Sequence, residues 1–280
     1  MIRLRLASAA ILIPILVVGL WAGGPLLTVL IAVVVLLAAG EVADLLRRAG
    51  LPAMPVLVIG LALLAVAEAA VAGLGRLWLM SAWVIAVVVF SGAAALLAHD
   101  TREGLLRWVG TAFGALYVGL LAFLLRIVVT TPPTGAGGVL AEVLDPARAW
   151  LLVVVLGVWA YDSAAYTIGR LYGRGRFFAH ISPHKTWSGA IGGTVGAIAA
   201  GGSLGWLVER PLVGLGLGAL IAVAAPAGDL AESMLKRAAG VKDSGQLIPG
   251  HGGMLDRVDS FVFTAPVAWV FLNVAVTGGG

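Results

Sequence analysis

Long apolar stretches follow one another along this chain with few polar residues between them. Of its 280 residues, 61% are hydrophobic and only 11% are charged, and the mean hydropathy is +1.06. Soluble domains carry about 25% charged residues, whereas an apolar run of about 20 residues matches the ~30 Å hydrocarbon core of a bilayer. The sequence therefore predicts an all-α, polytopic integral membrane protein that lies in a lipid bilayer.

The apolar runs predict about nine transmembrane helices. They cover residues 6–23, 25–46, 53–74, 78–98, 106–130, 148–170, 188–208, 211–235 and 258–277. The break at Gly23-Gly24-Pro25 predicts either a tight turn or a kink. No long polar linker interrupts the runs, so we expect a single membrane domain over residues 1–280, with N-terminal helices in 1–130 and catalytic helices and loops in 148–280. Segment 131–147 is expected to be a connector, and residues 1–21 a retained helix rather than a cleaved signal peptide.

The distribution of basic residues predicts an orientation. With the N-terminus in the cytoplasm, 14 of the 18 Lys and Arg residues fall on the cytoplasmic side, as the positive-inside rule requires. We therefore expect a multi-pass protein of the cell (inner) membrane whose polar loops face the cytoplasm. The basic residues are scattered over short loops, so no nucleic-acid binding is expected. The chain has no cysteine, which excludes disulfides and thiolate metal sites.

One polar segment, residues 229–259, stands between two apolar helices. It holds five of the fourteen acidic residues of the chain and four basic ones. The acids are Asp229, Glu232, Asp243, Asp256 and Asp259, and the bases are Lys236, Arg237, Lys242 and Arg257. Charged groups at the edge of a hydrocarbon-soluble segment are costly, so this segment is the first candidate for a functional site.

The acids of this segment have the spacing of a cation site. Asp229, Glu232, Ser233 and Lys236 recur at i, i+3, i+4 and i+7, on one helix face. Asp256 and Asp259 follow at the start of the last helix, and carboxylate oxygens suit Mg²⁺. The alternatives are a salt bridge to Lys236 and a favourable place in the helix dipole. One lysine does not balance all these carboxylates, which favours a cation.

The loop inside the segment has the composition of an anion-binding loop. Lys242 and Asp243 precede Pro249-Gly250-His251-Gly252-Gly253. Glycines let backbone N–H groups approach an anion closely. A glycine-rich loop on its own is a weak signal.

A second polar cluster lies at the end of helix 148–170. Asp162, Tyr166, Gly169 and Arg170 fall at i, i+4, i+7 and i+8. The next loop carries a lysine and hydroxyls that suit phosphate, at Ser182, Lys185, Thr186 and Ser188. His180 and His184 flank Ser182-Pro183 and are interpreted as loop residues rather than metal ligands.

The order of these residues resembles a family signature. Ser233-x-x-Lys236-Arg237-x4-Lys242-Asp243-x5-Pro249-x-His251-Gly252-Gly253-x-x-Asp256-Arg257-x-Asp259 is similar to the signature of the phosphatidate cytidylyltransferase family. Segments 162–170 and 181–186 also resemble that family. The resemblance covers about the C-terminal 45% of the chain, and the N-terminal helices resemble the family only in being hydrophobic. One position departs from it, because Ser188 stands where the family usually has a glutamate.

The resemblance implies a reaction, in which CTP and phosphatidate give CDP-diacylglycerol and pyrophosphate. The carboxylates and the resemblance both point to Mg²⁺ as cofactor. A second cation bridged by the same acids is a further expectation, and the resemblance implies a homodimer. The metal ligands expected are Asp229, Asp256 and Glu232, with Asp162 and Asp259 as second choices for ligands or for partners of the ligands. The catalytic residues expected are Asp229, Asp256, Lys236 and Arg257. The substrate-binding residues expected are Asp162, Ser182, Lys185, Thr186, Ser188, Ser233, Arg237, Lys242, Asp243, His251, Gly252, Gly253 and Asp259.

Two other functions fit part of the pattern. A CTP-dependent polyprenol or phytol kinase would share the membrane setting and the cation requirement, and a cation-coupled transporter would also carry intramembrane acids. Outside the segment, Glu41 and Asp44 precede Arg47 and Arg48, which predicts charge pairing at the interface. Glycines spaced along helices 188–208 and 211–235 predict close helix packing. Glu68 has no explanation from the sequence.

Overall fold

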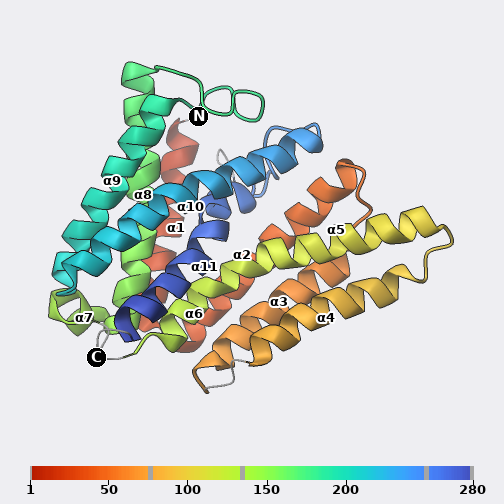
Figure 1. Cartoon of the computed structure of the whole chain (residues 1–280), viewed down its shortest axis with the longest axis horizontal. Coiled ribbons are helices and arrows are strands. Elements are labelled where there is room, and N and C mark those ends of the chain that lie inside the picture. Colours follow the sequence, from red (N-terminus) through yellow and green to blue (C-terminus); the bar gives the residue numbers. More distant parts are fainter. Residues whose placement is uncertain (1, 75–77, 133–135, 249–251, 278–280) are drawn as a thin grey trace. The chain divides into compact units, whose positions relative to one another are not determined.

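The regular structure of this chain is helical. The computed structural model describes residues 2–74, 78–132, 136–248 and 252–277 (Figure 1). Within these ranges no strand occurs, and extended pairing is limited to two isolated bridges, Arg176 with Thr186 and Ile248 with Gly252. The predicted all-α class is confirmed.

Seven helices of the described residues are long and apolar enough to cross a membrane. They are α2 (Gly24–Arg48), α4 (Trp78–Ala95), the continuous stretch Thr101–Thr130, α8 (Pro146–Tyr172), α9 (Trp187–Leu207), α10 (Pro211–Ala238) and α11 (Leu255–Thr277). Two shorter apolar helices, Leu12–Ala22 within α1 (Ile2–Ala22) and α3 (Pro55–Val71), occupy the other predicted segments. All nine predicted segments are thus helical, and the protein is a multi-pass membrane protein. That all nine helices cross the membrane stays a prediction.

The chain forms two compact units. The first contains Met1–Leu125 and Met234–Val258, and the second contains Arg126–Ser233 and Asp259–Gly280. Helices α10 and α11 each contribute residues to both units. The expectation of a single membrane domain stays a prediction, and each unit is described by itself.

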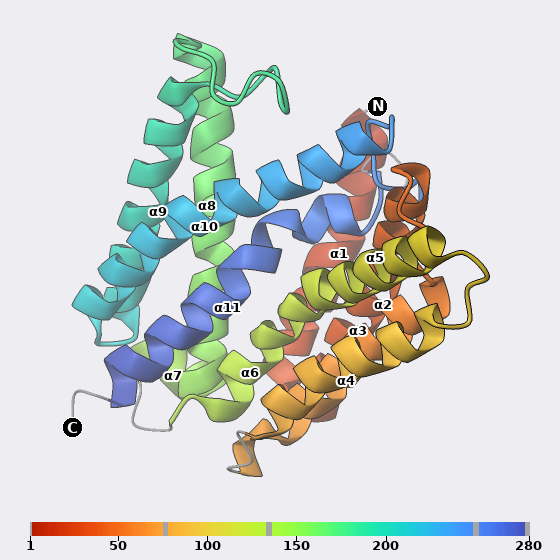
Figure 2. The same ribbon diagram turned by 45° about the vertical axis from the view of Figure 1, so that its right-hand side comes forward.

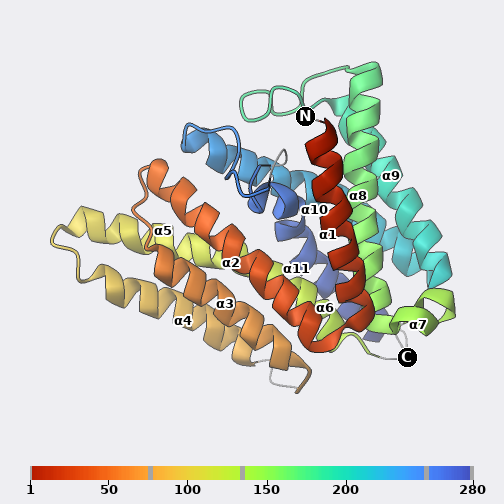
Figure 3. The same cartoon turned by 180° about the vertical axis from the view of Figure 1, so that it is seen from behind.

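The first unit is a helical bundle in which α2 packs against α3. It contains α1, α2, α3, a short 3-10 helix (Ala72–Leu74), α4, α5 (Thr101–Gly119) and a second 3-10 turn (Leu120–Ala122). Gly23 and Gly24 have φ of 60° and 47°, values that glycine tolerates, and α1 and α2 fold back on each other there (Figure 3). Of the two predicted alternatives, the turn is correct. Trp83 lies buried between helices and donates from Nε1 to the Leu61 carbonyl at 2.9 Å.

The second unit is built around the antiparallel pair α8 and α9 (Figure 2). It also contains α6 (Phe123–Thr130) from residue 126, α7 (Gly138–Leu144), α10 to Ser233 and α11 from Asp259. A Cβ on Gly201 would lie 2.3 Å from the Gly214 carbonyl oxygen, so glycine permits the contact between α9 and α10. The predicted close packing is confirmed. Segment 131–147, expected as a connector, contains the short helix α7, because Val139, Leu140, Val143 and Leu144 recur at helical spacing.

Candidate functional site

Three carboxylates gather in the second unit, and we call Asp229, Glu232 and Asp259 the acidic cluster. Each offers an oxygen, and these oxygens lie within 4.8 Å of one another. Asp229 and Glu232 are one turn apart on α10, and Asp259 lies in the second turn of α11. A Cβ on Gly228 would lie 2.4 Å from the Asp259 carbonyl oxygen, so glycine lets the two helices approach there. The Glu232 residue is fully buried.

A lysine from the loop between α8 and α9 contacts the acidic cluster. Lys185 Nζ lies 2.8 Å from Asp229 Oδ2, and both side chains are partly exposed. Ser233 Oγ donates to Asp229 Oδ1 at 3.4 Å. Clustered carboxylates in a buried site repel one another unless cations balance them, and Lys185 supplies one such positive charge.

The acidic cluster fits a divalent cation. Ligand oxygens lie about 2.1 Å from Mg²⁺, so ligands on opposite sides are about 4.2 Å apart. Only one pair among three ligands can lie on opposite sides, and adjacent ligands are about 3.0 Å apart. Oxygens within 4.8 Å of one another therefore need to approach by up to about 2 Å, which side-chain torsions supply. The donor set is all oxygen, which suits Mg²⁺ better than a softer metal. Of the expected ligands, Asp229 and Glu232 belong to this set, and Asp259 joins them.

Hydroxyl groups order the loop that carries Lys185. Thr186 Oγ1 accepts from the Gly189 N–H at 3.1 Å and so caps α9. Ser188 Oγ accepts from the Arg174 N–H at 3.1 Å and lies 3.2 Å from Thr186 Oγ1. Ser188 therefore joins the two ends of the loop. Ser182 takes part through its backbone, where its carbonyl accepts from the Lys185 N–H at 3.3 Å.

In the first unit, protein donors surround the carboxylate of Asp256. Lys236 Nζ lies 2.6 Å from Oδ1. Oδ2 accepts from the Ser244 N–H at 2.9 Å, from Ser244 Oγ at 2.8 Å and from the Gly253 N–H at 2.8 Å. The side chains of Asp256 and Lys236 are only 7% and 12% exposed. The glycine-rich loop thus directs one N–H at a carboxylate of the chain itself, and its role in phosphate binding stays a prediction.

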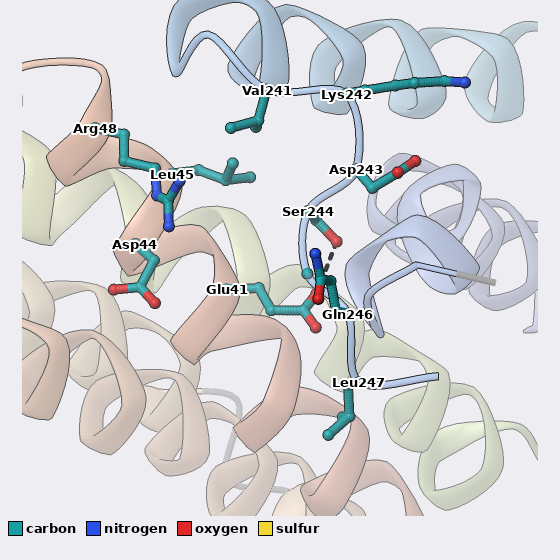
Figure 4. Close-up of a pocket in the computed structure, with 11 residues that line it drawn as sticks. Glu41, Asp44, Leu45, Arg48, Val241, Lys242, Asp243, Ser244, Gln246 and Leu247 are labelled. Carbon is teal, nitrogen blue, oxygen red and sulfur yellow. Dashed lines mark hydrogen bonds between the residues drawn. The ribbon is translucent and has the colours of Figure 1, made fainter. Parts of the chain in front are cut away.

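Glu41 of α2 holds the same loop. Its Oε1 accepts from the Met254 N–H and its Oε2 accepts from the Leu255 N–H, each at 2.8 Å. Oε2 also accepts from Ser244 Oγ at 2.8 Å (Figure 4). The predicted pairing at this helix end is confirmed for Asp44, which lies 3.6 Å from Arg47. The role of Glu41 was missed. The only signal for it in the sequence was an acid within an apolar run.

A pocket of about 600 Å³ opens between the end of α2 and residues 241–247. Arg48 and Gln246 line it together with Glu41 (Figure 4). Lys242 and Asp243 also line it, and their side chains point away from α2 (Figure 4).

The remaining expected residues lie as follows. Arg237 donates to the Val241 carbonyl at 3.2 Å, and Arg257 is exposed. Asp162 is on an exposed part of α8, where Arg170 donates to the Tyr166 hydroxyl at 3.0 Å. Gly252 has φ of 78°. His251 lies outside the described residues.

The expected metal ligands do not all belong to one unit. Asp229 and Glu232 lie in the second unit and Asp256 lies in the first. Binding of one metal by Asp229 and Asp256 together therefore stays a prediction, whereas the three residues of the acidic cluster are side by side.

The fold and these clusters define a multi-pass membrane protein with carboxylates and lysines gathered at helix ends and loops. The sequence model described as the cytidylyltransferase family matches residues 3–275, and the chain belongs to that family. The match extends beyond the C-terminal residues that carried the resemblance and includes the N-terminal helices.

Three relatives carry the same activity in their names. The chain is 49% identical over 128 residues to a phosphatidate cytidylyltransferase of Synechocystis, covering 44% of this chain and 43% of the relative. It is 39% identical over 206 residues to chloroplastic phosphatidate cytidylyltransferase 5 of Arabidopsis thaliana, covering 68% and 51%. It is 40% identical over 184 residues to a phosphatidate cytidylyltransferase of Brucella suis, covering 65% and 62%. The matched regions span about half the length of these relatives.

Proposed function

We propose that this protein transfers the cytidylyl group of CTP to phosphatidate, giving CDP-diacylglycerol and pyrophosphate for phospholipid biosynthesis. The names of its relatives support the reaction, because they all specify phosphatidate cytidylyltransferase. The structural observation that carries the proposal is the acidic cluster beside Lys185. Carboxylates that hold a cation and a lysine that binds phosphate both lower the charge repulsion in phosphoryl transfer between two anions.

The chemistry explains why such groups are needed. A phosphate oxygen of phosphatidate attacks the α-phosphorus of CTP and displaces pyrophosphate. The attacking phosphate needs little deprotonation, since the second pKa of phosphate monoesters is about 6. Repulsion between the two anions is then the main obstacle, and positive charge lowers it.

In the second unit, Mg²⁺ would be held by Asp229, Glu232 and Asp259. Metal binding by Asp256 and the presence of a second cation stay predictions. Bound Mg²⁺ would supply charge neutralisation to the transferring phosphoryl group and to pyrophosphate. Lys185 would bind phosphate oxygens as a point charge. Lys236, Arg237, Lys242 and Arg257 are the further cationic candidates for the phosphates.

The membrane setting suits the two substrates. Phosphatidate keeps its acyl chains in the leaflet, whereas CTP arrives from water. We propose that the polar loops face the cytoplasm of the cell (inner) membrane, which the excess of basic residues on that side supports. The homodimer stays a prediction.

Position-specific labelling tests the reaction. Purified protein receives CTP labelled at the α-phosphorus or at the γ-phosphorus, together with Mg²⁺ and either phosphatidate or a polyprenol or phytol. The proposal predicts that α-label enters the lipid and γ-label leaves in pyrophosphate. Transfer of γ-label to a polyprenol or phytol, with α-label left in CDP, would instead establish a kinase. No transfer, with cation-driven solute uptake into proteoliposomes, would establish a transporter.

A further inference from the structure

We propose that Glu41 is a positioning residue for the transfer reaction, which holds Ser244 and the first turn of α11 in place around Asp256. This inference rests on the proposed function. Glu41 lies outside the segment that carries the family signature, in a helix for which the sequence predicted membrane crossing and charge pairing with Arg47 and Arg48.

The geometry around Glu41 is that of a helix cap supplied by another helix. The first N–H groups of a helix have no acceptor within the helix itself. Glu41 accepts from Met254 and Leu255, at the point where α11 begins, and each bond is 2.8 Å long. Hydrogen bonds to a charged acceptor are about twice as strong as neutral ones. The carboxylate therefore fixes the start of the helix that carries Asp256.

Ser244 connects Glu41 to Asp256. Its Oγ lies 2.8 Å from Glu41 Oε2 and 2.8 Å from Asp256 Oδ2. A hydroxyl has one proton, so it donates to one of these carboxylates at a time. Glu41 and Asp256 thus compete for that hydrogen bond, and Ser244 Oγ joins the two carboxylates in one network.

Two glycines show how closely the loop is fitted to Glu41. A Cβ on Gly253 would lie 2.3 Å from Glu41 Oε2 and 2.2 Å from Ser244 Oγ. A Cβ on Gly245 would lie 2.7 Å from Glu41 Oε1, and all three of its nearest atoms belong to Glu41. A side chain at position 245 would therefore clash with Glu41 itself, and substitution of Gly245 tests this contact.

Hydrogen exchange of the full chain measures the positioning directly. Glu41→Gln removes an acceptor oxygen, and the amides of residues 252–258 should exchange about tenfold faster, the equivalent of one charge-assisted hydrogen bond. Glu103→Gln is the control, because Glu103 pairs with Arg107 on an exposed part of the same unit. Peptides of α8 and α9 should exchange as in the wild type, which shows that the variant is folded. Unchanged exchange at 252–258 would overturn the proposal.

A double-mutant cycle with Gly245 provides an independent readout. Gly245→Ala alone should accelerate exchange at 252–258, whereas in a Glu41→Ala background it should add little, because the clashing carboxylate is gone. Additive effects of the two substitutions would overturn the proposal.

Kinetics separate this proposal from the proposed function. Glu41→Gln should lower kcat about tenfold and leave KM for CTP unchanged, as expected for a lost positioning contact worth one hydrogen bond. If the wild type transfers α-label and the Glu41→Gln variant keeps the full kcat, the role of Glu41 is overturned and the proposed function stands. A wild type that transfers no label would overturn the proposed function, and exchange would still decide whether Glu41 holds the loop.

Discussion

Lys236 Nζ lies 2.6 Å from Asp256 Oδ1, and this ion pair joins the end of α10 to the first turn of α11. Both side chains are nearly buried, and the other oxygen of Asp256 is occupied by donors from the loop between the two helices. The sequence suggested a metal ligand at Asp256 and a salt bridge for Lys236 as an alternative. The structure places these two residues against each other.

The first prediction concerns the stability that this pair supplies. Asp256→Asn removes the negative charge 2.6 Å from the mostly buried ammonium of Lys236, which costs about 3 kcal/mol. At about 2–4 °C per kcal/mol for a protein of this size, Tm should fall by about 6–12 °C. Differential scanning fluorimetry in detergent measures it. Asp44→Asn is the matched control, because its partner Arg47 is 3.6 Å away and both are exposed, so Tm should hardly change. An equal Tm for Asp256→Asn and wild type would contradict the structural role.

A second prediction concerns metal binding by the acidic cluster. Glu232→Gln removes one carboxylate from a fully buried position, so affinity for Mn²⁺, used as a paramagnetic substitute for Mg²⁺, should fall about tenfold or more. Electron paramagnetic resonance of the purified protein measures free Mn²⁺ without turnover. Glu142→Gln makes the same chemical change on an exposed part of the second unit and should leave the affinity intact. Identical Mn²⁺ binding by Glu232→Gln and wild type would exclude Glu232 as a ligand.

A third prediction concerns the sign of the effect of Lys185. Lys185→Met removes a positive charge 2.8 Å from Asp229 Oδ2. Because like charges repel, Mn²⁺ should then bind more tightly, while KM for CTP should rise about tenfold with the loss of a charged phosphate contact. Mn²⁺ titration and initial rates measure these opposite changes. Parallel weakening of both would indicate that Lys185 only supports the local structure.

A fourth prediction tests the packing of α9 against α10. Gly214→Ala places a methyl group 2.2 Å from the Gly201 carbonyl oxygen, so the helices must separate and the variant should unfold several degrees earlier. Gly60→Ala is the control, since a Cβ on Gly60 would meet no atom within 4 Å, and alanine is the better helix former. A normal Tm for Gly214→Ala would show that the two helices do not need this contact.

Much of this architecture follows from local patterns in the sequence. Apolar length located the helices, since a bilayer fixes how long they must be. Helical spacing placed Asp229 and Glu232 on one face of α10, and the structure brings their oxygens together with that of Asp259. Local patterns indicated these three acids because they lie within one helix or at the start of the next, but they ranked Asp256 above Asp259, and Asp256 lies in the first unit.

The contacts that sequence reasoning missed join residues far apart in the chain. Glu41 and Ser244 are 203 positions apart, and nothing in the apolar run around Glu41 indicates which loop it meets. The partner of Lys185 was likewise unspecified, because a loop lysine has several acids within reach in the sequence. Helix α7 was missed because glycines and prolines surround its short apolar run.

The most direct test of the account is pyrophosphate release by purified protein with CTP, phosphatidate and Mg²⁺, in the wild type and in Asp229→Asn. The account predicts that pyrophosphate appears in step with CDP-diacylglycerol, that a chelator stops both, and that Asp229→Asn slows both about 100-fold or more, as expected when several kcal/mol of charge stabilisation are lost. A folded Asp229→Asn protein that works at the wild-type rate, or release that a chelator does not affect, would contradict it.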